Sequence, residues 1–193
     1  MRMGRDKVLL PFEGRSFVEN TYEKASVCFE RIIISTDTEE HAGKIRALPL
    51  FAGKNPEIVT DRYRETGPIG GLLSVFEETD AERFSVISVD VPYARMEVLA
   101  GLFDECDKKA CFLKIKENPP EPLIAAWDRK AYPELKQSFA EGKFKLRRVL
   151  LPEDVRILDD TGFKKIYPEL ENTDFEKVFR NFNTPEEFEK LYE

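Results

Sequence analysis

Three short stretches that each end in aspartate decide the expected fold: IIISTD at residues 32–37, EIVTD at 57–61 and VISVD at 86–90. Their β-branched runs are typical of buried strands whose two faces are covered by helices, and they predict strands at 32–35, 57–60 and 84–89. Helical patterns follow these strands at 38–47, 69–79 and 95–107. This alternation predicts βαβ units and a mainly parallel sheet.

The rest of the chain continues the alternation. Ser16 and Glu19 have the spacing of a capping box, which predicts a helix over 16–28. Further strands are expected at 110–116, 122–127 and 154–159, further helices at 131–141, at 144–150 and from Thr184-Pro185 onward, and long loops at 118–120 and 160–174. We find no internal repeat or linker, so residues 1–193 are predicted to form a single α/β domain.

Composition excludes several classes of protein. The 193 residues are 41% hydrophobic and carry a net charge of −7, which argues against a nucleic-acid-binding protein. Apolar runs are much shorter than the ~18 residues of a membrane span, and no signal peptide is apparent. Three cysteines without a CxxC pair, and a single histidine, His41, argue against a disulfide framework and a zinc ribbon. We therefore expect a cytoplasmic protein with neither a nucleic-acid nor a membrane partner.

The aspartates that end the three strands are Asp37, Asp61 and Asp90. Ligands of open α/β sheets bind beyond the carboxyl ends of the strands, so these side chains are expected to crowd along one edge. Carboxylates gathered there can hold a hard cation such as Mg²⁺ or hydrogen-bond the ribose and base of a nucleotide. Each aspartate could instead serve only as a helix N-cap.

A glycine-rich stretch and two basic stretches add weaker signals. In TGPIGGLLS (66–74), Gly67, Gly70 and Gly71 allow close approach of the backbone to a phosphate, although tight helix–sheet packing accounts for them equally well. Basic residues exceed acidic ones within 1–16 and 141–151. Positive charge beside a bound metal suits polyphosphate chemistry, whereas a solvated helix face is the alternative for 141–151.

The motifs, in their order along the chain, resemble one family. Residues 2–20, RMGRDKVLLPFEGRSFVEN, resemble the second half of the nucleotidyltransferase signature AGGxSxRMGxDKxLLxxxGxxxxE. Further matching stretches are DRYRETGPIGGLLS (61–74), VDVPYA (89–94), PEPLIAAW (120–127), EGKFKLRRVL (141–150) and NFNTPEEFEKL (181–191). Together they resemble the molybdenum cofactor guanylyltransferases of the MobA type.

This resemblance implies a Rossmann-like three-layer α/β sandwich of the nucleotide-diphospho-sugar transferase type. It implies an enzyme that transfers GMP from GTP to Mo-molybdopterin with Mg²⁺ and releases pyrophosphate. Expected partners are GTP and Mo-molybdopterin, with molybdenum cofactor insertion proteins or molybdoenzymes as recipients of the product. A second copy of the chain is a further expected partner.

The resemblance also implies roles for individual residues. Lys7 and Asp90 would be catalytic, with Lys7 on the nucleotide phosphates and Asp90 on Mg²⁺. The other residues that would bind GTP are Arg2, Gly4, Asp37, Asp61, Gly67 and Gly70. Those that would bind molybdopterin are Arg147, Arg148, Asn181 and Asn183.

The sequence departs from the family pattern in three ways. Asp37 stands where an asparagine is more common, and Glu121 replaces the glutamine of a PQP motif. The chain starts inside the signature, so the first strand and the AGGxS loop are expected to be missing, which would leave open sheet edges, marginal stability or a substitute partner. The alternatives are a sister nucleotidyltransferase that uses CTP or another phosphorylated acceptor, and an inactive nucleotide- or cofactor-binding module.

Overall fold

The computed structural model describes residue 9, residues 11–12 and residues 14–182. The strands are β1 (Pro11–Phe12), β2 (Arg15–Ser16), β3 (Ile33–Thr36), β4 (Glu57–Thr60), β5 (Arg83–Ile87), β6 (Ala110–Lys114), β7 (Glu121–Asp128) and β8 (Val155–Asp159). The α-helices are α1 (Phe17–Cys28), α2 (Glu39–Arg46), α3 (Pro68–Glu78), α4 (Met96–Asp104), α5 (Tyr132–Ala140), α6 (Asp160–Ile166) and α7 (Phe175–Val178). Short 3-10 helices are η2 (Pro49–Phe51), η3 (Arg129–Ala131), η4 (Leu146–Arg148), η5 (Pro152–Asp154) and η6 (Pro168–Leu170).

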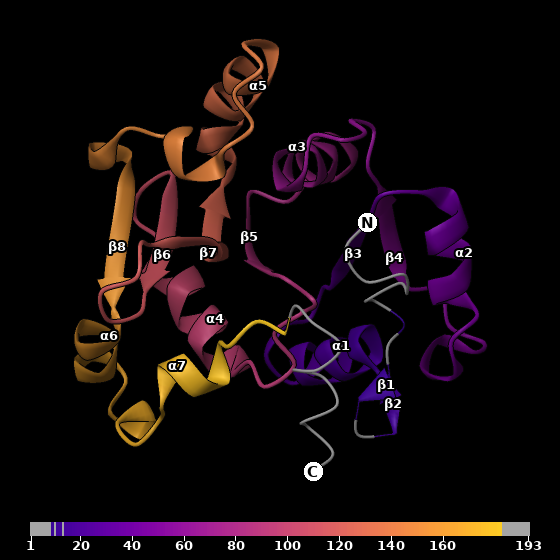
Figure 1. Cartoon of the computed structure of the whole chain (residues 1–193), viewed down its shortest axis with the longest axis horizontal. Coiled ribbons are helices and arrows are strands. Elements are labelled where there is room, and N and C mark those ends of the chain that lie inside the picture. Colours follow the sequence, from indigo (N-terminus) through magenta and orange to yellow (C-terminus); the bar gives the residue numbers. More distant parts are fainter. Residues whose placement is uncertain (1–8, 10, 13, 183–193) are drawn as a thin grey trace.

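The strands form a four-stranded sheet in the order β5-β7-β6-β8, a parallel pair β3-β4, and a small antiparallel ribbon of β1 and β2 (Figure 1). Strand β7 is antiparallel to both β5 and β6, whereas β8 is parallel to β6. Strands β5, β6 and β8 therefore share one direction, and β7 is the reversed strand of their sheet. The predicted α/β fold with mostly parallel strands is confirmed.

Ion pairs join the amino-terminal ends of β3, β4 and β5. The guanidinium of Arg31, just before β3, lies 2.8 Å from the Glu57 carboxylate at the start of β4 and 2.7 Å from that of Asp80, just before β5. All three strands therefore start at one edge and run the same way. Within the described part of the chain, β3 and β5 are nevertheless not hydrogen-bonded to each other.

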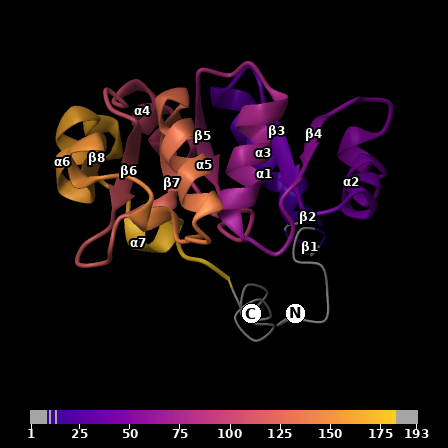
Figure 2. The ribbon, with the colours of Figure 1, turned by 90° about the horizontal axis from the view of Figure 1, so that it is seen from above.

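Helices cover both faces of the four-stranded sheet, which gives the three layers seen from above in Figure 2. Alternate residues of β6 point to opposite faces: Cys111 and Leu113 pack with α4, whereas Ala110 and Phe112 pack with α3 and α5. Trp127 of β7 is fully buried on the second face and donates its indole N–H to the Pro122 carbonyl at 3.0 Å. The sheet is thus apolar on both sides, as the continuous apolar runs predict.

Helix α1 begins where the capping box predicts. The Ser16 backbone N–H donates to the Glu19 carboxylate at 3.0 Å, and the Glu19 N–H donates to the Ser16 hydroxyl at 3.4 Å. Glu19 is buried and also accepts the Leu50 backbone N–H at 2.9 Å, so it joins the start of α1 to η2. Burial opposes ionisation, but these hydrogen bonds hold the pKa of Glu19 below its ordinary value.

Two expectations about the carboxyl-terminal third are wrong. Residues 160–174 are not a loop, because the Asp159 carboxylate accepts the Gly162 N–H at 2.6 Å and starts α6, whose Phe163 is buried against α4. Residues 144–150 form only the 3-10 turn η4, in which Leu146 is buried, with Leu150 buried after it. The helix expected from Thr184 onward lies outside the described residues.

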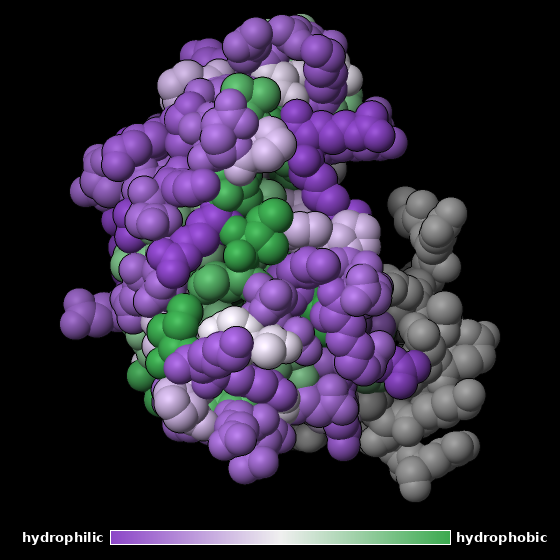
Figure 3. Space-filling view, turned by 90° about the vertical axis from the view of Figure 1, so that its left-hand side faces the viewer, coloured by the Kyte–Doolittle hydropathy of each residue, from purple (hydrophilic) through white to green (hydrophobic). Residues whose placement is uncertain are grey.

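Strand β8 is an edge strand with apolar side chains at the surface. Figure 3 faces this side of the molecule and shows apolar side chains lying between hydrophilic ones. The exposed apolar residues on or near this strand are Leu151, Ile157 and Ile166. Among the described helices, none is long and apolar enough to cross a membrane.

We predict that Glu19 makes stability depend on pH. Its stabilisation is fully present above the unfolded-state pKa of about 4.3 and is lost as the pH falls through the lower folded-state pKa. Glu19→Gln should lower the free energy of unfolding by about 1–2 kcal/mol at pH 7 and flatten its decline in acid. Urea unfolding between pH 3 and 7 measures this, with the exposed change Glu30→Gln as the control. Equal acid slopes for parent and Glu19→Gln would contradict the assignment.

Candidate functional site

The candidate site lies at the carboxyl ends of β3 and β4, centred on Asp61. The parallel pairing of Ser35 with Val59 and of Thr36 with Thr60 brings the two strand ends together, and the Asp61 backbone N–H donates to the Thr36 carbonyl at 2.8 Å. The Ser35 hydroxyl donates to the Asp61 carboxylate at 3.0 Å. This hydrogen bond fixes the orientation of one carboxylate oxygen and leaves the second available to a ligand.

The Asp61 carboxyl group is tuned by its surroundings. Burial raises its pKa, the hydrogen bond from Ser35 lowers it in part, and the negative charge of Asp37 raises it further. A half-buried carboxylate with an elevated pKa gains most from a ligand that brings N–H donors. Asp61 is therefore suited to accept hydrogen bonds from a base or a sugar.

Glycines let the start of α3 approach this carboxylate closely. A Cβ atom at Gly71 would lie 2.9 Å from the Ser35 hydroxyl and 3.2 Å from the Asp61 carboxylate, and one at Gly70 would lie 2.7 Å from the Tyr63 carbonyl. Gly67, the N-cap of α3, has φ +68°, a conformation that favours glycine. Tight packing thus accounts for Gly70, whereas Gly71 shapes the wall of the site.

Asp37 follows β3 directly and lies beside the candidate site. Its carboxylate pairs with the imidazole of His41, one helical turn along α2, while the Thr38 hydroxyl accepts the His41 N–H at 3.2 Å and caps the helix. The charge of Asp37 reaches Asp61 electrostatically. The alternative of an aspartate that caps a helix is wrong for Asp37, since its neighbour Thr38 performs that role.

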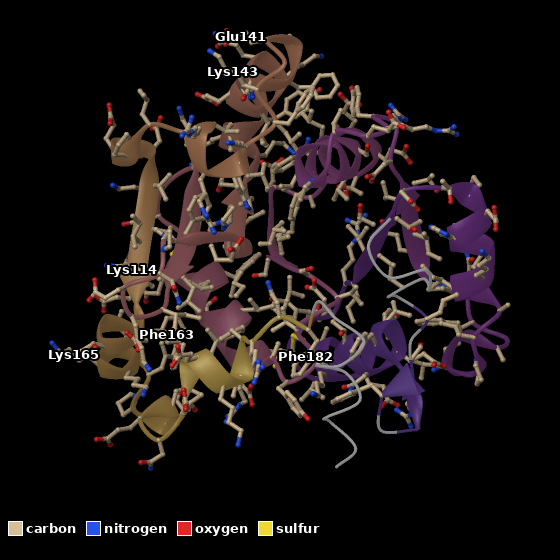
Figure 4. The ribbon with its side chains drawn as sticks, viewed as in Figure 1. Lys114, Glu141, Lys143, Phe163, Lys165 and Phe182 are labelled. Carbon is tan, nitrogen blue, oxygen red and sulfur yellow. The ribbon has the colours of Figure 1, made fainter. Side chains whose placement is uncertain are left out.

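Asp90 follows β5 after two further residues. Its backbone carbonyl accepts the Phe182 N–H at 3.0 Å, and the buried Phe182 ring contacts Tyr93. Figure 4 shows Phe182 on the segment that returns from α7 toward this region. The contact brings exposed Asn181, from the far end of the sequence, beside Asp90.

Among the described residues, no group of three or more acidic, histidine or cysteine side chains could hold a metal ion. Asp37, Asp61 and Asp90 therefore do not form a three-carboxylate metal group, although Asp37 and Asp61 do lie at neighbouring strand ends. The physical reason is the separation of the sheets: Asp37 and Asp61 end one strand pair, whereas Asp90 follows β5 of the other sheet. Asp90 still fits Mg²⁺ in another way, because Mg²⁺ often takes one or two carboxylates and completes its shell with substrate phosphates and water.

Two basic residues of 141–151, Lys143 and Arg147, pair with residues outside the candidate site. Arg147 donates to the Pro120 carbonyl and to the Glu121 carboxylate, both at 2.8 Å. Glu121, the departure from the PQP motif, thus has a cationic partner. Lys143 and Glu141 pair beyond the end of α5, away from Phe182 (Figure 4). Arg148 is exposed, and neither arginine contacts Asp61 or Asp90 through a described hydrogen bond or ion pair.

Four of the predicted site residues, Arg2, Gly4, Lys7 and Asn183, lie outside the described residues. Sequence reasoning missed Ser35, which holds Asp61. It named Gly71 as a glycine that allows close backbone approach, and the structure shows that this approach is of α3 to Ser35 and Asp61. The signal for Ser35 is its place two residues before the aspartate in IIISTD, which is opposite Val59 in a parallel register. Finding it requires knowing which strands pair, and the sequence pattern alone leaves that open.

Comparisons with known proteins agree on one family. Residues 1–157 match the family described as MobA-like NTP transferase domain. A probable molybdenum cofactor guanylyltransferase of Methanosarcina mazei is 27% identical over 194 residues, which cover 98% of this chain and 84% of that protein. A protein of the same name from Geobacillus sp. (strain WCH70) is 26% identical, with 98% and 91% of the two chains covered.

Solved structures agree with this match. The crystal structure of molybdopterin-guanine dinucleotide biosynthesis protein A from Archaeoglobus fulgidus has a TM-score of 0.77 and 25% identity, and the match covers 98% of this chain and 90% of that one. Rv0371c from Mycobacterium tuberculosis has a TM-score of 0.69 at 17% identity over 98% and 90% of the two chains, a likeness of fold alone. The fold is therefore that of the nucleotide-diphospho-sugar transferases, as predicted.

We predict that Gly71→Ala weakens nucleotide binding at least fivefold, because the added Cβ presses on Ser35 and Asp61. Overpacking of this kind should cost about 1–3 kcal/mol of stability. Gly43→Ala is the matched control, since a Cβ there meets nothing within 4 Å and lies inside α2. That change should stabilise the protein by about 0.5–1 kcal/mol and leave binding unchanged. Calorimetric titration and thermal unfolding measure both, and equal affinities for the two variants would contradict this role of Gly71.

We also predict that Asp61 destabilises the protein without ligand at neutral pH. A folded-state pKa above the unfolded value of about 3.9 means that stability rises as the pH falls and Asp61 takes up its proton. Asp61→Asn should therefore unfold at a higher temperature than the parent at pH 7, and this advantage should shrink toward pH 4. Thermal unfolding across that range gives the result, and an advantage that grows in acid would reverse the assigned sign.

Proposed function

Because the chain belongs to the MobA-like NTP transferase domain family, we propose that it transfers GMP from GTP to Mo-molybdopterin and releases pyrophosphate. The proposed product is the guanine dinucleotide form of the cofactor. The family makes the chain a nucleotidyltransferase, and the names of the relatives from M. mazei and Geobacillus support guanylyl transfer.

The observation that supports a nucleotide ligand best is the cradle formed by Ser35, Asp61 and Gly71. Its oriented carboxylate can accept the ring N–H and exocyclic amino donors of guanine, or ribose hydroxyls. Cytosine lacks a ring N–H donor, so a carboxylate that accepts both guanine donors favours GTP over CTP. Asp37 adds a second acceptor at the neighbouring strand end.

In the proposed reaction, an oxygen of the cofactor's terminal phosphate attacks the α-phosphorus of GTP. The new O–Pα bond forms as the bond from Pα to the bridging oxygen of the β-phosphate breaks, and pyrophosphate leaves with that electron pair. No covalent enzyme intermediate is required, so the protein contributes positioning and charge neutralisation. Lys7 and Arg2 are the proposed cations for the phosphates.

Asp90 is the residue proposed to hold Mg²⁺. The ion would neutralise charge on the triphosphate as pyrophosphate leaves. The hydrogen bond from Phe182 to the Asp90 backbone fixes the segment that carries this carboxylate. The chain's own contribution here is the fixed position and the negative charge of the Asp90 carboxylate.

The pterin side of the site is proposed around Asn181 and Asn183. The hydrogen bond from Phe182 brings Asn181 toward Asp90, and the sequence motif supports Asn183. Their amides suit the donor and acceptor pattern of a pterin ring. Arg147 and Arg148 are weaker candidates for the cofactor phosphate, since Arg147 already pairs with Glu121. Handover of the product to an insertion protein or a molybdoenzyme completes the proposed role.

We predict that Asp90→Asn lowers the turnover of GTP with Mo-molybdopterin at least 100-fold, measured as pyrophosphate release. It should also remove the Mg²⁺ dependence of GTP binding, measured by calorimetry with and without the ion. Asp107→Asn is the control, because Asp107 is an exposed carboxylate near Arg156. That variant should keep both properties.

The same titrations test base specificity. Binding of GTP at least tenfold tighter than CTP supports the proposed reaction, and the reverse order overturns it in favour of a cytidylyltransferase. Turnover that survives in Asp90→Asn would remove Asp90 from the metal role without affecting base specificity.

A further inference from the structure

A large apolar slot separates β3 from β5, and it reaches the candidate site at Ser35 and Gly71. The cavity has a volume of about 870 Å³. It is bounded by β3 and β5 along its sides and by α1, α4 and α3 above and below. Figure 1 shows β3 and β5 at the facing edges of the two separate sheets.

Both strands that flank the slot have an edge whose hydrogen bonding is incomplete within the described chain. Strand β3 pairs with β4 on one side, and β5 pairs with β7 on one side. The facing edges therefore present backbone N–H and C=O groups to the slot. Backbone groups inside a protein are rarely left without partners, so an occupant must supply both donors and acceptors at regular spacing.

The size of the slot fits one strand. A strand rises about 3.3 Å per residue, with about 4.8 Å between strands and about 10 Å between layers, so each residue of an interior strand takes about 160 Å³. A cavity of about 870 Å³ therefore has room for about five residues. This matches the five residues of β5 and the four of β3.

The lining of the slot determines the chemistry of the occupant. Its central walls are apolar and are formed by Ile32, Ile34, Leu72, Val86, Leu99 and Phe103. The charged lining residues, Glu30, Arg31, Arg83 and Asp104, lie toward the amino-terminal ends of β3 and β5. None of the β5 residues is fully buried, although β5 lies between helices, whereas four of the five β6 residues are buried. Apolar side chains in the slot would cover the surface of β5 that the rest of the described chain leaves exposed.

We propose that this slot binds one extended, uncharged segment of about five β-branched residues as an added strand, parallel to β3 and β5. The ion pairs of Arg31 with Glu57 and Asp80 hold the starts of the flanking strands together, so a single added strand can run parallel to both at once. A lipid or another apolar small molecule fits less well, because it cannot satisfy two rows of backbone groups. The added strand would join the two sheets into one and would end near Ser35, Gly71 and Val89, beside the candidate site.

The direct test adds a peptide, acetyl-Lys-Thr-Val-Ile-Val-Ile-Val-Thr-Lys-amide, to the full chain. Hydrogen exchange should slow at least tenfold in 33–36 and 83–87 and remain unchanged in 110–114, which pairs on both sides already. At a concentration about 100 times Kd, the unfolding temperature should rise by about 5–10 °C. A peptide with proline at its central position, which lacks a donor, should give neither effect.

A variant of the protein provides the matched control. Ala100→Trp projects a large ring from α4 into the slot and should abolish peptide protection without lowering the unfolding temperature. Ala52→Trp, at an exposed position outside the slot, should bind the peptide like the parent. A nitroxide at the carboxyl end of the peptide should broaden the amide signals of Ser35 and Gly71 and spare that of Arg31.

Several results would overturn the proposal. Equal protection by the proline peptide would show non-specific association, and broadening of Arg31 alone would show an antiparallel strand. Protection of both segments before peptide is added, in a species that light scattering identifies as a dimer, would assign the slot to a second copy. These readouts do not depend on GTP turnover, so they stand apart from the test of the proposed reaction.

Discussion

The need to pair every backbone N–H and C=O in the interior governs this structure. Strands β6 and β7 meet it fully, because each has a neighbour on both sides and apolar layers above and below. Strands β3 and β5 meet it on one edge only within the described chain. The pairing of strands is therefore continuous around β6 and β7 and interrupted at the slot. The same division places Asp37 and Asp61 at the end of one strand pair and Asp90 after a strand of the other sheet.

The chemistry of the site follows from where the parallel strands end. A parallel register between β3 and β4 places Ser35 against the strand that carries Asp61, and the glycine at position 71 lets α3 close over both. This carboxylate is partly desolvated and held in one orientation, which suits it to accept hydrogen bonds from N–H donors more than to ligate a metal by itself. Asp90 faces a different neighbour, the segment ending at Phe182, so the proposed nucleotide and metal roles divide between the two sheets.

Much of the fold could be predicted from the sequence, because local signals decided it. The span of β4 was predicted to the residue, and the capping box of Ser16 and Glu19 marks the start of α1. Helix α6 was missed, since its cap, Asp159, precedes a segment containing Gly162 that carries little helical pattern. The site was predicted only in part, because strand order and the partner of Asp61 depend on tertiary pairing rather than on local pattern.

The division of the sheets bears directly on catalysis. Transfer of a nucleotidyl group requires the base-binding and metal-binding groups to be held within a fraction of an ångström of their working positions. Here Asp61 belongs to the β3–β4 pair and Asp90 follows β5 of the four-stranded sheet. The two parts are joined by packing of α1 and α3 and by the ion pair of Arg31 with Asp80, not by hydrogen bonds between strands within the described chain. Surface ion pairs contribute little rigidity. A strand bonded to β3 and β5 would couple the two carboxylates through continuous backbone hydrogen bonds. Occupancy of the slot would therefore affect the position of Asp61 relative to Asp90.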